Sequence, residues 1–310
     1  MTPQLSIITV LFGGAETLAD TLPTWRDAFG SPEVEIVVVD NSPSDDVETL
    51  VRATLGDSNL VYVKRPDNPG FAAGANLGAA MARSEKLIFL NADIYVDSGT
   101  PQALLRIPPE VKVGAIRLRT NGVVYEGIKL SWYGYLEDRK AGDPARMFGP
   151  SGGGAFYQRS IFEELGGFSE SMFAWGEDSA LALQASAAGH ATRLLDLTLE
   201  HIGGHTVASI AGRRFKARLL ARNRVWTFRS HFATSYKWLV AVPFFGALTA
   251  NGLLRKSRDG SLVPYFQGVM DGLLVTPPHV DPSRAFSPWS RPSESSAHPH
   301  KYSASTSEDF

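Results

Sequence analysis

The chain has 310 residues, 44% hydrophobic and 20% charged, which is ordinary for a globular protein and fits one large domain with or without an extension. It has no cysteine, which excludes disulfides, thiolate metal sites and cysteine nucleophiles and favours the cytosol. The first apolar run, Leu5 to Phe12, is short and β-branched with no basic region before it, so we interpret it as a strand rather than a signal peptide.

Positive charge is concentrated in one segment. From His201 to Arg258 there are eleven Lys or Arg and no Asp or Glu, so the remainder of a chain with net charge −2 carries about −13. Such a segment predicts an anionic partner, which could be membrane phospholipid, a lipid-linked diphosphate or nucleic acid. A solvated helix face is the alternative interpretation.

Strands and helices alternate through the first third of the chain. Nearly continuous apolar runs are typical of parallel strands that are buried on both faces. The alternation therefore predicts an α/β fold with a doubly wound sheet. The expected strands are 5–12, 35–39, 60–63 and 86–90, and the expected helices are 15–29, 45–55 and 71–83.

The pattern is looser after Asp93. A hairpin turning at Asn121-Gly122 is expected to join strands 113–119 and 123–130. Residues 132–148 are polar and aromatic, and we expect them to form a loop over a site. A glycine-rich strand at 151–157, helices at 160–165 and 177–188, and a strand at 193–199 complete this part.

Three regions are predicted: a catalytic domain at 1–206, a basic helical extension at 207–278 and a disordered tail at 279–310. The apolar run from Trp238 to Leu254 has 17 residues, fewer than the roughly 20 that a membrane-spanning helix needs. We therefore expect a membrane-surface or packing helix there. The tail is rich in Ser, Pro and His and has little to bury.

Polar motifs follow the expected strands of the first third. They are Asp40-Asn41-Ser42, the stretch from Asn68 to Gly78, and Asn91-Ala92-Asp93. Because ligands of open α/β sheets bind outside the carboxyl ends of the strands, these motifs should converge on one crevice. A carboxylate there would suit a divalent metal that carries phosphate oxygens.

Together with Gly166-Gly167-Phe168 and the stretch from Trp175 to Asp178, these motifs resemble the family 2 glycosyltransferases in order and spacing. The chain is most similar to their rhamnosyltransferase-like branch, over roughly 5–205, and its basic segment looks like the tail of that branch. The resemblance implies a GT-A-like α/β fold, in which a sheet for nucleotide-diphospho-sugars is flanked by helices and followed by a C-terminal helical extension.

The resemblance also implies donor-binding residues. Asp40 would accept a hydrogen bond from the imide of uracil or thymine, although a turn aspartate capping Ser42 is the alternative. In the 68–78 stretch, glycines would let the backbone approach the ligand and amides would bind ribose or phosphate, unless the glycines serve only close helix packing. The implied donor set is Thr9, Asp40, Asn68, Gly70, Gly74, Asn76, Asn91, Gly153 and Trp175.

For the chemistry, the resemblance implies that Asp93 and His201 bind Mg²⁺ or Mn²⁺, which would stabilise the departing nucleoside diphosphate. Asp178 would be the base that removes the acceptor proton, with Glu177 as the nearby alternative. Simple helix or turn capping is the competing interpretation of these acids. The chain departs from the family pattern at Ala180 and Gln184, where an acid and an arginine are frequent.

The resulting expectation is a metal-dependent inverting glycosyltransferase. It would move rhamnose or another hexose from a dTDP- or UDP-sugar to a hydroxyl of a glycan or lipid-linked acceptor in cell-envelope polysaccharide synthesis. It would be cytoplasmic, with peripheral attachment to the anionic inner face of the plasma membrane, and it would have no nucleic-acid partner. A nucleotidyltransferase is disfavoured because the loop at 13–16 has no basic residue. A catalytically silent glycan- or partner-binding module remains the second candidate.

Overall fold

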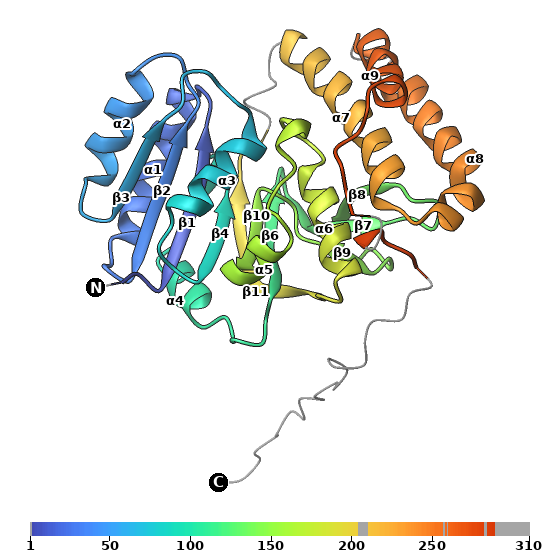
Figure 1. Cartoon of the computed structure of the whole chain (residues 1–310). Coiled ribbons are helices and arrows are strands. Elements are labelled where there is room, and N and C mark those ends of the chain that lie inside the picture. The colour runs from blue at the N-terminus through green and yellow to red at the C-terminus, as the bar shows by residue number, and fades with distance from the viewer. Residues whose placement is uncertain (1, 204–209, 257, 259, 282–283, 289–310) are drawn as a thin grey trace.

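One mixed sheet runs through the protein, in the order β3-β2-β1-β4-β10-β6-β11-β5. The computed structural model describes residues 2–203, 210–256, 258, 260–281 and 284–288 (Figure 1). The strands on this path are β1 (Leu5–Leu11), β2 (Val34–Asp40), β3 (Leu60–Lys64), β4 (Lys86–Leu90), β5 (Ile94–Tyr95), β6 (Val113–Thr120), β10 (Gly154–Gln158) and β11 (Thr192–His201).

The first four strands are parallel, as their uninterrupted apolar sequences predicted, and β10 enters antiparallel beside β4. Every residue of β2 is buried, because helices cover both faces of this half of the sheet. One face is covered by α1 (Ala15–Phe29), α2 (Asp46–Leu55) and α4 (Thr100–Leu105), and the other by α3 (Phe71–Met81), α5 (Arg159–Glu164) and α6 (Glu177–Ala187).

A second part of the sheet branches from β6. The turn at Asn121-Gly122 has the positive φ angles of 50° and 77° that a tight hairpin needs, and it leads into β7 (Val123–Leu130) as expected. The expectation of a loop at 132–148 is wrong, because β8 (Leu136–Lys140) and β9 (Met147–Gly149) both pair with β7. Leu136 is buried, and Glu137 lies opposite Lys129, so alternating apolar and charged side chains support a strand there.

The C-terminal helices do not stand apart from this hairpin. They are α7 (Ile210–His231), α8 (Thr234–Asn251), the π-helical turn η3 (Gly252–Lys256) and α9 (Leu262–Leu274), which gather on one side of the sheet (Figure 1). Their buried aromatic and aliphatic side chains form one core with residues of β7, β8 and α6. The expected boundary near 206 lies outside the described residues, but the extension beyond it shares a core with the hairpin.

The apolar helix of the extension is longer than expected. The continuous helical stretch Thr234–Lys256 has 23 residues and a mean hydropathy of 1.3. By length and composition it could cross a membrane, but the core helices of some soluble proteins meet the same criteria. Only 22% of its apolar window is buried in the protein. Its exposure distinguishes it from an ordinary core helix.

The expected disorder of the tail is wrong for residues 284–288. Phe286 pairs with Phe232 in a β-bridge, and its amide donates to the carbonyl of His231 at 2.7 Å. Its ring packs edge-on against Phe148 at 5.2 Å, so an aromatic residue in a polar segment was enough to anchor it. Residues 282–283 and 289–310 of the predicted tail lie outside the described part of the chain.

Candidate active site

Asp40 ends β2 and is fully buried. Its carboxylate accepts hydrogen bonds from Tyr62 (2.6 Å), from Lys64 (2.8 Å), its register partner on β3, and from the Ser42 amide (2.8 Å). Burial raises the pKa of Asp40, but these bonds outweigh it and leave that pKa below its usual value. In this conformation the Asp40 carboxylate is therefore occupied by partners within the protein, and a nucleobase would have to replace one of them.

The expected donor motif at 68–78 makes internal contacts instead. Gly70, at a φ of 94°, leaves room for Phe173, since a Cβ there would lie 2.6 Å from the Phe173 ring. A Cβ on Gly74 would lie 2.8 Å from the Val10 side chain. Both glycines therefore permit close packing with neighbouring side chains, the alternative role considered from the sequence, and their contact with a donor stays a prediction. Asn68, also at positive φ (43°), accepts a weak bond from the Gly70 amide at 3.3 Å and caps the turn.

Asn76 binds a neighbouring loop rather than facing a ligand. Its amide nitrogen donates to the Phe168 carbonyl (2.8 Å) and to the Glu170 carboxylate (3.0 Å), and its oxygen accepts from the Phe168 amide (2.9 Å). Ala72 adds a backbone bond to the Phe173 carbonyl at 3.1 Å. The motif thus holds the loop that leads into Asp178, and the donor-binding role expected of Asn76 stays a prediction.

Thr9 lies inside β1 and is 1% exposed. Its hydroxyl oxygen has no hydrogen-bond partner among the described residues. A buried hydroxyl without a hydrogen-bond partner costs free energy. The Thr9 side chain is buried inside the sheet, so in this conformation it is not open to a sugar-nucleotide ligand.

The predicted metal residues meet. Asp93 follows β4, His201 ends β11, and their Oδ1 and Nε2 atoms are 3.1 Å apart. The second carboxylate oxygen accepts from the Gly203 amide at 3.2 Å, and Thr120 lies 3.0 Å from the other ring nitrogen. The two side chains are about one-fifth exposed, and the histidine and backbone bonds lower the pKa of Asp93 against the effect of burial. His205, the other histidine of this segment, lies outside the described residues.

A glycine turn connects this pair to the predicted base. The Asn91 amide donates to the Gly153 carbonyl at 3.2 Å, and a Cβ on Gly153 would lie 2.8 Å from the Asn91 side chain. The adjacent Gly152 amide donates to Oδ2 of Asp178 at 2.9 Å. Asn91, Gly153 and Asp178 are thus brought together as predicted, although the space that Gly153 leaves is taken by Asn91.

The two acids that open α6 differ in environment. Asp178 faces a cavity and accepts two backbone bonds, from Gly152 and from Ser179 at 2.6 Å. Glu177 is 5% exposed, and its Oε2 atom has no partner among the described residues. Burial, with a smaller contribution from the charge of Asp178, raises the pKa of Glu177 to about 8. At neutral pH Glu177 therefore holds its proton, and Asp178 is the acid that opens to the cavity.

Asn223 of α7 fixes the loop before these acids, and sequence reasoning missed it. It is completely buried, and its amide nitrogen donates to the carbonyls of Met172 (2.9 Å), Ala174 (2.9 Å) and Trp175 (2.8 Å). Phe173 and Trp175 have φ angles of 66° and 63°, which are unusual for residues with side chains. A polar residue inside an otherwise basic and apolar helix was the available signal.

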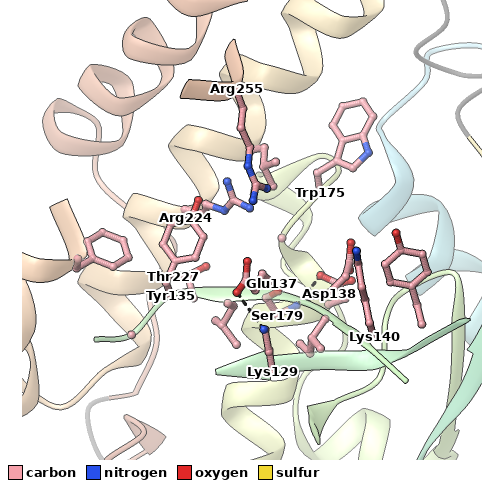
Figure 2. Close-up of a pocket in the computed structure, with 18 of the residues that line it drawn as sticks. Lys129, Tyr135, Glu137, Asp138, Lys140, Trp175, Ser179, Arg224, Thr227 and Arg255 are labelled. Carbon is pink, nitrogen blue, oxygen red and sulfur yellow. Dashed lines mark hydrogen bonds and ion pairs between the residues drawn. The ribbon is translucent and has the colours of Figure 1, made fainter. Parts of the chain in front are cut away.

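A cavity of about 620 Å³ opens beside Asp178 (Figure 2). The β7–β8 hairpin forms one wall with Lys129, Glu137 and Asp138, and α7 and η3 form the other with Lys216, Arg224 and Arg255. Trp175 lies at its edge, with Phe215 at 6.2 Å and the Lys216 ammonium at 5.5 Å from its ring. Trp175 therefore lies beside a cavity, and its contact with a sugar stays a prediction. The two walls of this cavity were not expected from the sequence.

The departures from the expected motif at Ala180 and Gln184 have a packing explanation. Ala180 is 1% exposed in a small cluster with Met172 and Trp226, and Gln184 lies 3.4 Å from His231 of α7. Helix α7 therefore covers the face of α6 that bears these positions. A charged pair there would be buried against α7, so the substitutions do not bear on Asp178.

The sequence matches the description Glycosyl transferase family 2 over residues 6–166. Poly-beta-1,6-N-acetyl-D-glucosamine synthases of Staphylococcus aureus, for example from strains COL and N315, are 23% identical over 137 residues. The alignment covers 43% of this chain and 33% of the synthase, so the chain spans about a third of the length of these curated relatives.

Among solved structures, the fold is similar to that of the mannosyltransferase PcManGT from Pyrobaculum calidifontis in complex with GDP-Man and Mn²⁺ (TM-score 0.55, 16% identity, 88% of each chain). It is also similar to S. aureus TarS 1-349 (TM-score 0.53, 16% identity, 86% of this chain and 81% of that one). The expected GT-A-like α/β fold with a helical extension is thereby confirmed. Since the family match covers more than half of its residues, the chain belongs to Glycosyl transferase family 2.

Proposed function

We propose that the protein is a metal-dependent inverting glycosyltransferase. The observation that carries this proposal is the continuous connection from Asp93 and His201, through Asn91 and the 152–153 turn, to Asp178 at the mouth of a cavity. The diphosphate of the sugar donor would bind at Asp93 and His201, and the acceptor hydroxyl would bind at Asp178. The two groups would then lie on the two sides of one glycine turn. That is the arrangement which a displacement at an anomeric carbon needs.

The residues fit a divalent ion that is shared with phosphates. Among the described residues no three His, Asp or Glu side chains gather as a metal site. Mg²⁺ and Mn²⁺ commonly take one or two protein ligands and complete their shell with phosphate and water, so Asp93 with His201 is a sufficient set. When bound, such an ion neutralises the charge that develops on the leaving diphosphate.

Asp178 is the base in this proposal, and Glu177 is not. Asp178 is open to the cavity, whereas Glu177 is buried and protonated at neutral pH. In an inverting transfer the carboxylate takes the proton of the acceptor hydroxyl while that oxygen bonds to the anomeric carbon and the nucleoside diphosphate leaves. A neutral Glu177 spares Asp178 the repulsion of a second charge.

The donor is proposed to be a dTDP- or UDP-linked hexose. TarS has been solved with UDP and with UDP-GlcNAc, and PcManGT with GDP-Man, which supports a nucleotide-diphospho-sugar without naming one. Rhamnose is our preferred sugar because of the motif resemblance to the rhamnosyltransferase-like branch. Contact between a base and Asp40 would require Tyr62 or Lys64 to move, because both now bind that carboxylate.

The acceptor is proposed to be a hydroxyl of a cell-envelope glycan or glycolipid, modified on the cytoplasmic side of the membrane. The curated relatives are polysaccharide synthases, and the basic extension with its exposed apolar helix supports peripheral attachment to an anionic membrane. No nucleic-acid partner is proposed.

Thermal unfolding with nucleoside diphosphates, with and without Mn²⁺, tests the donor site. A ligand of the native state must stabilise it, so dTDP or UDP should raise the melting temperature only when the metal is present. Asp93→Ala should abolish this effect, and Asp178→Asn should retain it while losing about 10²- to 10⁴-fold in transfer or donor hydrolysis. Stabilisation by a glycan and by no nucleotide would instead support the silent binding module and overturn the enzyme.

A further inference from the structure

The cavity beside Asp178 has one positively charged wall. Arg224 enters it from α7 and Arg255 from η3, opposite Glu137 and Asp138 of the hairpin (Figure 2), and Lys216 of α7 also lines it. None of the three forms an ion pair with a carboxylate in the described part of the chain, whereas Lys129 on the hairpin wall binds both Glu137 and Asp143. Lys216 and Arg224 instead interact electrostatically with Asp138 across the cavity.

Two of the three cations on this wall lie against aromatic rings. The Arg224 guanidinium lies 4.6 Å from the centre of the Tyr135 ring, and the Lys216 ammonium lies 5.5 Å from that of Trp175. Such contacts fix the side chains while leaving their N–H donors unused. A guanidinium with free donors has the geometry for bidentate hydrogen bonds to a phosphate.

The surface next to this wall is apolar and open. Of the fifteen large hydrophobic side chains that are exposed among the described residues, ten lie between Trp238 and Val275 on α8, η3 and α9 or directly after them. Val242 is 85% exposed, and Leu253 and Leu254, which directly precede Arg255, are 53% and 66% exposed. A monomeric soluble protein rarely exposes so many large hydrophobic side chains in one segment of its chain. When cationic side chains accompany them, such a surface is typical of a protein that binds to a membrane interface.

We propose that the cavity is the acceptor site and that Arg224, Arg255 and Lys216 bind a phosphate of a lipid-linked acceptor, while the exposed apolar residues of α8, η3 and α9 lie in the bilayer. Arg255 follows directly on exposed leucines, so a phosphate at the membrane surface would reach it first. The sugar or hydroxyl beyond that phosphate would then extend towards Asp178. This inference rests on the proposed function, because it takes Asp178 as the base.

Binding to vesicles tests the inference with the full chain. The probe is phosphatidylcholine vesicles containing a long-chain isoprenyl monophosphate, with pure phosphatidylcholine vesicles for comparison. A cation near an anionic lipid contributes about fivefold in affinity, so Arg224→Gln/Arg255→Gln should weaken binding about 30-fold and Arg255→Gln alone about fivefold. The control Arg106→Gln/Arg193→Gln removes the same charge from exposed positions outside the cavity and should bind like the wild type.

A second pair of variants tests the apolar surface. Trp238→Ser/Val242→Ser changes side chains that are 81% and 85% exposed, so folding should be unaffected, and binding to both kinds of vesicle should fall. Soluble glycerol phosphate should compete with the lipid phosphate only weakly. Equal competition would show that the phosphate is recognised without a lipid and would overturn the membrane part of the inference.

The two proposals fail in different ways. If Mn²⁺ and nucleoside diphosphates do not stabilise the wild type, the proposed function fails. If they do, but the arginine variants bind the lipid phosphate as tightly as the wild type, only the acceptor site is refuted. It is also refuted if the arginine variants lose nucleotide-dependent stabilisation to the same extent, because the cations would then serve the donor. The melting temperature of each variant without ligand shows whether it is folded, and the exposed Arg255 provides the safer single change.

Discussion

Replacing Glu177 with glutamine should change how stability depends on pH. The pKa of this carboxyl rises from 4.5 to about 8 on folding, so between these values the folded chain holds a proton that the unfolded chain has released. Stability must then fall as pH rises through this window, by about 1.4 kcal/mol per pH unit for one proton. Below pH 4.5 both states are protonated and the penalty vanishes.

The magnitude follows from that window. From pH 5.5 to 7.5 the wild type should lose about 2.5 kcal/mol relative to Glu177→Gln, which keeps the shape of the side chain and cannot ionise. For a chain of this size the gap corresponds to roughly 4 °C in melting temperature. The site around Oε2 of Glu177 holds no hydrogen-bond partner among the described residues for either side chain, so the test is the change of the gap with pH and not its value at one pH.

Thermal unfolding followed by circular dichroism at half-unit steps of pH measures this gap. Comparing the two proteins cancels the titration of every other group, and Glu110→Gln, at an exposed position, controls for the loss of one surface charge. Parallel curves for wild type and Glu177→Gln would refute the idea that Glu177 is buried and protonated. Loss of sugar transfer in Glu177→Gln, with transfer retained in Asp178→Asn, would show that Glu177 is the base and that Asp178 is not.

Three further changes test the loop before Asp178. Asn223→Ala removes the side-chain donor of the Ala174 and Trp175 carbonyls, while the Met172 carbonyl keeps Arg222 and the Ala174 amide, so we expect a loss of about 1–3 kcal/mol in unfolding free energy and a fall in kcat greater than any rise in KM. Asn76→Ala should lower the melting temperature while nucleotide-dependent stabilisation persists, and loss of that stabilisation would restore the donor role expected from sequence. Gly70→Ala places a Cβ 2.6 Å from Phe173 at a φ of 94°, so chemical denaturation should show a loss of at least about 2 kcal/mol, and an unchanged midpoint would contradict the close contact.

The sheet was predictable because its residues carry the information locally. Strands such as β2 are apolar at nearly every position, and a chain that alternates such runs with helices has few ways to bury them. The meeting of Asp93 with His201 also followed from the motifs, since both end strands of one sheet. What could not be predicted was the direction of small polar side chains: Asn76 faces a loop that is distant in sequence, and only the packing of α3 on that loop decides this.

The cavity wall shows the same limit more sharply. Along α7, residues 217, 221, 225 and 228 recur at helical spacing and are buried, while Lys216, Leu220, Arg224 and Thr227 form a second face that lines the cavity. Spacing alone could identify both faces, but it could not say what lies opposite the second one. That partner is the β7–β8 hairpin, whose second strand reads as a loop in sequence because only Leu136 of its side chains is buried. A basic helix thus became a cavity wall through a contact between two segments that are about 80 residues apart, and the proposed acceptor phosphate depends on that contact.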